Sequence, residues 1–135
     1  MTGREYKNHT FEHFAKIANA FSSPKRLEII DLLSQGEKDV DTLAKETNMN
    51  FANASRHLQL LKSANIVKSR KEGIRVIYFV STDEVIVCWK NLQNLAEKTV
   101  AELRNIAKSF LDQRSVLEPI SVSELLSKIH DEDIV

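Results

Sequence analysis

The feature that most constrains the fold of this chain is a change in the period of its apolar residues near residue 65. Before that point the apolar residues recur at every third or fourth position, which indicates amphipathic helices. From Ile66 to Val80 they alternate with polar residues on both sides of Glu72-Gly73, which indicates a β-hairpin. Helical spacing returns after Ser81. The sequence therefore predicts a mainly α fold with one small β-hairpin, in the order α-α-α-α-β-β-α.

Capping residues and helix breakers divide the segment before the hairpin into four helices. The first is expected over residues 5–21, and the fourth over residues 50–62 with Asn50 as its N-cap. Between them lie a helix that begins at Ser23 and a short helix capped by Asp39. The side chains expected to point into the core are Leu27, Ile30, Leu33, Val40, Leu43, Ala44, Ala54, Leu58 and Leu61.

A single long helix is expected after the hairpin. Ser81 and Glu84 form a capping box, and apolar side chains then recur at alternating intervals of three and four residues as far as Phe110. A helix of roughly 30 residues would be about 45 Å long, which is longer than a domain of this size can cover. Part of its apolar stripe is therefore predicted to pack against the same helix of a second copy. The predicted dimerisation residues are Phe11, Phe14, Trp89, Leu92, Leu103, Ile106 and Phe110.

The distribution of charge points to a polyanion as partner, although the 135-residue chain carries 19 basic and 19 acidic residues and no formal net charge. Between Asn50 and Val80 six basic residues accompany one acidic residue, so this segment carries +5 and the remainder −5. A local basic field is what phosphate binding requires. No apolar run approaches the roughly 18 residues of a membrane span. We therefore expect no membrane partner and a cytoplasmic location.

Two short helices joined by a tight turn and followed by a basic hairpin make a winged helix-turn-helix, in which the second helix enters the DNA major groove. Because Ala54, Leu58 and Leu61 point inward, the opposite face of residues 50–62 carries side chains that can bond base edges or phosphates. The alternative is a merely solvated helix face, and Phe51 could equally stack on DNA or pack. The residues predicted to bind double-stranded DNA are Asn50, Phe51, Asn53, Ser55, Arg56, His57 and Gln59 in the helix, and Arg70, Lys71 and Arg75 in the hairpin.

Four segments of the chain resemble successive signature segments of the ArsR/SmtB repressors, namely residues 20–33, 55–61, 64–67 and 70–73. The resemblance implies a transcriptional repressor that binds an inverted-repeat operator as a homodimer and releases it when an effector binds. Asn65 stands where these repressors usually have glycine. Asparagine also tolerates the left-handed backbone that is expected there at the end of a helix.

The metal ligands of the metal-sensing ArsR/SmtB repressors are missing. Where those proteins carry a Cys-x-Cys pair at the start of the third helix, this chain has Asp39 and Asp41, so thiophilic ions lose their ligands. No histidine occurs between residues 84 and 113, where the resemblance implies the other metal site. His9 and His13 have the spacing at which two imidazoles can share a metal, but such spacing arises by chance on exposed helices. We predict no metal and no cofactor.

Cys88 is the one cysteine, which excludes an intramolecular disulfide and a site built from several thiolates of one chain. Beside Trp89 it is expected to be a small buried residue. The alternative is a reactive thiol that is oxidised or persulfidated, in which case the unknown effector would be related to sulfur or redox chemistry.

The C-terminal segment sets the predicted domain organisation. Residues 1–113 are expected to form the DNA-binding and dimerisation domain, and residues 114–135 a linker with a short helix. Residues 118–135 resemble the start of a rhodanese domain, with a terminal capping helix as the alternative. Two other functions stay open: a winged-helix module that binds protein, and the regulatory part of a rhodanese-type sulfurtransferase. The chain carries no recognisable catalytic motif, so we expect no enzymatic activity.

Overall fold

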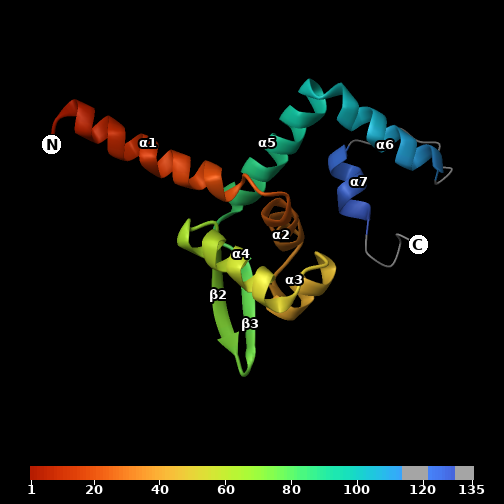
Figure 1. The fold of residues 1–135 in the computed structure, drawn as a ribbon, viewed down its shortest axis with the longest axis horizontal. Helices are drawn as coiled ribbons and strands as arrows, with labels where there is room; N and C mark the ends of the chain where they lie inside the picture. The colour runs from red at the N-terminus through yellow and green to blue at the C-terminus, as the bar shows by residue number, and fades with distance from the viewer. Residues whose placement is uncertain (114–121, 130–135) are drawn as a thin grey trace. The chain divides into compact units, whose positions relative to one another are not determined.

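The computed structural model describes residues 1–113 and 122–129. The chain, drawn in Figure 1, divides into two compact units, Met1–Ile86 and Val87–Val135. The predicted linker directly after residue 113 and the end of the rhodanese-like segment, from residue 130, lie outside the described residues. None of the described helices is both long enough and apolar enough to cross a membrane.

Four helices precede the hairpin, as the sequence predicts. They are α1 (Gly3–Ala20), α2 (Pro24–Ser34), α3 (Val40–Glu46) and α4 (Phe51–Ser63). The predicted N-caps are confirmed, because side-chain oxygens of Ser23, Asp39 and Asn50 accept the backbone N–H three residues further on, at 3.3, 2.8 and 2.8 Å. These bonds satisfy donors that the first turn of a helix leaves without a partner.

The hairpin is confirmed, and a third strand that the sequence did not predict joins it. β2 (Val67–Glu72) and β3 (Arg75–Val80) pair antiparallel, and together with their turn they are called the wing below. β1 (Lys38–Asp39) pairs with the other edge of β3, which gives the order β1-β3-β2. A strand of two residues is too short to show alternation, so its sequence carries no periodic signal. Its pairing holds the α2–α3 connection against the wing.

The core of the first unit lies between α2, α3, α4 and the sheet. The predicted inward faces of α3 and α4 are confirmed, because all six of their expected core residues are buried. The prediction for α2 is wrong in one position: Leu27 is only half-buried, whereas Arg26 and Ile29 are buried beside Ile30 and Leu33. The buried face of α2 is wider than one stripe because the helix packs against both α4 and β3.

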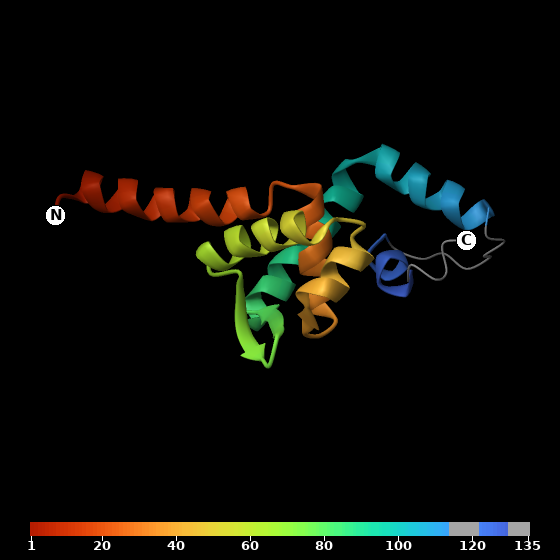
Figure 2. The same cartoon turned by 60° about the horizontal axis from the view of Figure 1, so that its bottom comes forward.

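α1 contributes almost nothing to this core. Ala20 is the one buried residue among its 18, and Figures 1 and 2 show the helix extending away from the other helices of its unit. The aromatic rings of Phe11 and Phe14 meet edge to face with 5.8 Å between their centroids, and both side chains are more than half exposed. The helix therefore presents an apolar surface that its own unit leaves uncovered.

The prediction of one long helix after the wing is wrong, because the helix is broken at Val100. α5 (Asp83–Thr99) ends there and α6 (Ala101–Gln113) begins. The β-branched pair Thr99-Val100 lies at the break, where such residues lose side-chain freedom in a helix. The Arg104 guanidinium then donates from Nε to the carbonyl oxygen of Glu97 at 2.7 Å, which satisfies an acceptor that the end of α5 exposes.

The predicted capping box at the start of α5 is also wrong. The hydroxyl of Ser81 donates to the backbone carbonyl oxygen of Asn65 at 2.7 Å, and the helix begins two residues later at Asp83. Asn65 itself has the predicted left-handed backbone, with a φ of 62°. Ser81 therefore joins the end of β3 to the end of α4.

A short C-terminal helix is confirmed as α7 (Val122–Lys128).

Candidate nucleic-acid interface

The burial of one face of α4 decides which of its side chains can reach a ligand. Ala54, Leu58 and Leu61 are fully buried. The first turn carries Phe51, which is 57% exposed, and one turn further along lies Arg56, which is also exposed. α4 thus presents an exposed polar edge around Arg56, and the ring of Phe51 is exposed at its N-terminal end.

Arg56 and Asn53 form a pair on this edge. The guanidinium Nη2 of Arg56 donates to the amide oxygen of Asn53 at 2.9 Å, one turn apart on the helix. Asn53 also gives its backbone N–H to the Asn50 side chain, and Ser55 is half-buried beside them. The contact holds both polar groups in a fixed geometry near the start of the helix.

His57 is turned toward the protein more than the sequence predicts. It is half-buried, and its Nδ1 lies 3.5 Å from Nη1 of Arg26 in α2. Burial, and then the positive charges of Arg26 and Arg56, lower the pKa of His57 below its ordinary value of 6.5. The imidazole is therefore neutral near pH 7 and offers a hydrogen bond rather than a positive charge.

Two further side chains of α4 connect the helix to the wing. Gln59 donates from Nε2 to the hydroxyl of Tyr78 at 3.3 Å, and Lys62 donates to the hydroxyl of Ser69 at 2.9 Å. Gln59, which the sequence predicts to contact DNA, is exposed, and its amide lies against Tyr78 of β3. These bonds fix the spacing between the helix and the wing.

The arginines of the wing are paired with carboxylates. Arg70 donates to both oxygens of Glu37 and, from Nε at 2.9 Å, to Glu72. Arg75 donates from Nε to Asp39 at 2.9 Å. The positive charge predicted for residues 50–80 does not include Glu37 and Asp39, which lie earlier in the chain and reach the wing through the pairing of β1. Their position next to Lys38, before a predicted helix, did not indicate that they would contact the wing.

Hydrogen bonds lower the pKa of two of these carboxylates, Asp39 and Glu37. Hydrogen bonds from Thr42 and then the Arg75 guanidinium lower the pKa of Asp39 to about 2. The hydrogen bond from Arg70 lowers the pKa of Glu37. Both groups are ionised at neutral pH and offset the charge of the arginines. Lys71, the third residue predicted in the wing, is exposed.

The predicted dimerisation residues differ in exposure. Phe11, Phe14 and Ile106 are 58%, 59% and 59% exposed, whereas Trp89 is buried. Leu92, Leu103 and Phe110 are half-buried. Because of the break at Val100, these residues lie on three helices rather than two.

Cys88 and the histidines of α1 show no assembled site. The expectation that Cys88 is buried is wrong, since its side chain is exposed on α5, and its redox role stays a prediction. In α1, His9 lies 4.0 Å from Glu12. Among the described residues no group of three or more side chains has the arrangement of a metal site.

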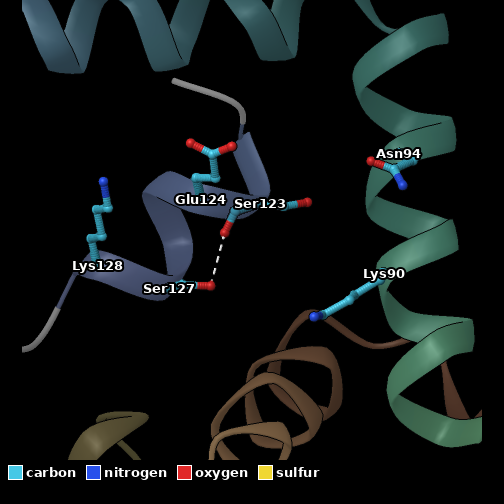
Figure 3. Close-up of a pocket in the computed structure, with 6 residues that line it drawn as sticks. All are labelled: Lys90, Asn94, Ser123, Glu124, Ser127 and Lys128. Atoms are coloured by element: carbon cyan, nitrogen blue, oxygen red, sulfur yellow. Dashed lines mark hydrogen bonds between the residues drawn. The ribbon is translucent and has the colours of Figure 1, made fainter. Parts of the chain in front are cut away.

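A cavity of about 350 Å³ lies in the second unit between α5 and α7 (Figure 3). Figure 3 shows Lys90 reaching from α5 toward α7, where the hydroxyl of Ser127 donates to the backbone carbonyl oxygen of Ser123 at 3.0 Å. The hydroxyl of Ser123 is buried and has no hydrogen-bond partner among the described residues. The remaining lining residues are Asn94, Glu124 and Lys128. The lining residues are of polar types and carry charges of both signs.

Known proteins that resemble the chain are transcriptional regulators. The model of the family described as bacterial regulatory protein, arsR family, matches residues 23–69. The HTH-type transcriptional regulator Rv0324 of Mycobacterium tuberculosis is 34% identical over 129 residues, which are 95% of this chain but 56% of that protein. A homolog of the cadmium resistance transcriptional regulatory protein CadC from Staphylococcus aureus is 36% identical over 94 residues, 69% of this chain and 72% of that protein.

The solved structures agree with this assignment. The homodimeric winged helix-turn-helix DNA-binding domain of Mb0332 from Mycobacterium bovis, described as a possible ArsR-family transcriptional regulator, superposes with a TM-score of 0.69 at 33% identity. The match covers 76% of this chain and 93% of that domain. The predicted winged helix-turn-helix fold is confirmed, and the chain belongs to the arsR family of bacterial regulatory proteins.

Proposed function

We propose that the chain is a transcriptional repressor that binds double-stranded DNA as a homodimer. The observation that carries the proposal is the exposed edge of α4, which is anchored to the core by its opposite face. On this edge Arg56 and Asn53 are joined by a hydrogen bond, in the second helix of a winged helix-turn-helix. That is the helix which enters the major groove in proteins of this fold.

The side chains of this edge have the chemistry of base recognition. Arginine forms paired hydrogen bonds with guanine, and asparagine with adenine, in the major groove. The ring of Phe51 offers an apolar surface for a thymine methyl group. Lys71, exposed in the wing, would contact the phosphate backbone and add affinity without sequence information.

The exposed apolar residues of α1 support the homodimer. Tyr6, Phe11, Phe14 and Ile17 are between 43% and 66% exposed, which is unfavourable for a helix in water. A two-fold dimer would place two copies of α4 against two half-sites about 34–36 Å apart, so the operator is expected to be an inverted repeat. The bound dimer would repress by covering the promoter, and an effector that favours a different dimer arrangement would release it.

Fluorescence anisotropy tests the proposal with a duplex from the region upstream of the chain's own gene, over a series of salt concentrations. We expect selective binding that weakens linearly in log salt. Asn53→Ala/Arg56→Ala should weaken binding about tenfold or more. The matched control is Asn105→Ala/Lys108→Ala, which removes an amide and a cation at the same spacing from α6.

The outcomes separate the parts of the proposal. If the Asn53/Arg56 variant is folded and binds like the wild type, α4 is not the reading helix. If the folded wild type shows no preference for the upstream duplex over a scrambled one at any salt concentration, operator binding at its own promoter is wrong. If light scattering shows a monomer, only the dimer part of the proposal is contradicted.

The second candidate is a winged-helix module that binds protein. The pairing of Arg70 and Arg75 with carboxylates favours it, because both pairs reduce the attraction of the wing for phosphate. Binding to a protein partner that is insensitive to salt, together with no binding to any duplex, would support this candidate.

A further inference from the structure

The guanidinium of Arg70 is enclosed by carboxylates on two of its edges. Its Nη1 and Nη2 donate side by side to the two oxygens of Glu37, with Nη1 to Oε2 at 2.7 Å. Its Nε and Nη2 lie 2.9 Å from Oε1 of Glu72. The guanidinium also lies over the ring of Phe79, with 5.8 Å from Cζ to the ring centroid.

This arrangement uses the donors that a phosphate would need. Arginine binds a phosphate or a carboxylate through the same pair of parallel N–H groups. The Glu37 carboxylate occupies that pair, and Glu72 occupies the neighbouring edge. Arg70 therefore cannot offer a paired contact to DNA while Glu37 remains bound to it.

Glu37 can be substituted without altering the fold, whereas Asp39 cannot. Asp39 caps α3 and pairs with Arg75, so its replacement would alter the helix as well as the wing. The Glu37 side chain is 51% exposed, and its carboxylate bonds to Arg70. A substitution at Glu37 thus tests the charge pair alone.

We propose that Glu37 masks Arg70 and thereby limits the affinity of the wing for the DNA backbone, an inference that rests on the proposed DNA binding. Glu37 acts as an internal competitor that occupies the position of a backbone phosphate. Removing it turns Arg70 into an additional phosphate contact. Because exposed ion pairs are weak and are screened by salt, the masking is largest at low ionic strength.

The test compares Glu37→Gln, Glu37→Asp and wild type in binding to the upstream duplex and in the salt concentration that elutes each from a heparin column. Glu37→Gln should bind the duplex about threefold more tightly at low salt. The slope of log affinity against log salt should steepen by about 0.9, the value for one more phosphate contact. Glu12→Gln is the control, because it changes the net charge equally on α1.

Glu37→Asp distinguishes contact from charge. Its side chain keeps the negative charge but is one methylene shorter, so the paired contact with Arg70 weakens. Masking predicts that Glu37→Asp binds more tightly than wild type and less tightly than Glu37→Gln. If it binds like wild type, the effect of Glu37 is only that of a nearby charge, and the masking is wrong.

The heparin series keeps this inference separate from the proposed function. The salt concentration that elutes the protein from heparin measures the attraction of the wing for an anionic polymer that contains no operator sequence. If no variant binds the upstream duplex selectively, the proposed function fails, while later elution of Glu37→Gln than of Glu12→Gln still supports masking. Equal elution of the two variants overturns it.

Discussion

Nη1 of Arg26 in α2 lies 3.5 Å from Nδ1 of His57 in α4, and the same guanidinium holds the end of α1. Its Nε and Nη2 donate at 2.9 Å to the carbonyl oxygens of Ala20 and Asn19. The last carbonyl oxygens of a helix lack intrahelical partners, and a cation is favourable beside them. One buried side chain therefore connects the helix proposed for dimerisation to the helix proposed for reading DNA.

Replacing Arg26 should destabilise the first unit. Arg26→Gln removes two charge-assisted hydrogen bonds to the last carbonyl oxygens of α1, so we expect a loss of about 2–4 kcal/mol in the free energy of unfolding. Urea denaturation measures it. Arg56→Gln is the matched control on the exposed edge of α4, with an expected change within about 0.5 kcal/mol. Equal losses in the two variants would contradict the role of Arg26.

The low pKa of His57 predicts that the protein loses stability in mild acid. The folded pKa lies below the ordinary 6.5, so the unfolded chain takes up this proton first as the pH falls. The contribution is complete above pH 6.5 and is lost as the pH falls through the folded pKa. When the pH is lowered from about 7.5 to about 5.5, the urea concentration at the midpoint of unfolding should fall more in wild type than in His57→Gln. A variant at the exposed His13, His13→Gln, should behave as wild type does.

Asp39 is predicted to support both α3 and the wing. Asp39→Ala removes the N-cap and the pair with Arg75, at a cost of about 1–2 kcal/mol in unfolding free energy. Asp39→Asn keeps a capping oxygen and loses only the exposed pair, so it should cost less than about 1 kcal/mol. Because the folded pKa is about 2, this stabilisation exists above pH 3.8 and disappears as the pH falls toward 2. In an acid titration, the stability difference between Asp39→Asn and wild type should be constant above pH 3.8 and should disappear as the pH falls toward about 2.

The apolar surface of α1 is predicted to be part of the dimer. Phe14→Glu places a charge among exposed aromatic side chains and should convert the dimer into monomers in light scattering at micromolar concentration. His13→Glu introduces the same residue at the adjacent position, on a different side of the helix, and should leave the dimer intact. A dimeric Phe14→Glu would show that α1 is not in the interface.

The features that the sequence predicts correctly are local. A cap such as Asp39 lies three residues from the N–H that it accepts, and the inward face of α4 repeats within a few turns. The resemblance to ArsR/SmtB repressors then identified the family. The contacts that were missed join residues far apart in the chain: Arg26 to His57 over 31 residues and Glu37 to Arg70 over 33. Only tertiary packing brings such pairs together, so no periodic pattern reports them.

The break at Val100 was missed for a different reason. The apolar spacing of three and four residues continues through it from Ala96 to Leu103, so the pattern is that of an unbroken helix. The two β-branched residues at the break are a weak signal, because helices tolerate them at small cost. The partner of the freed carbonyl, Arg104, is visible only in the folded chain.

The isolation of α1 also affects how the protein responds to dilution. An isolated helix of 18 residues is marginal in water, and a single buried residue gives α1 little support from its own unit. At protein concentrations below the dissociation constant of the dimer, α1 should unwind while the remainder of its unit stays folded. The helical content seen by circular dichroism would then fall with concentration, so that secondary structure itself reports the fraction of chains that are paired.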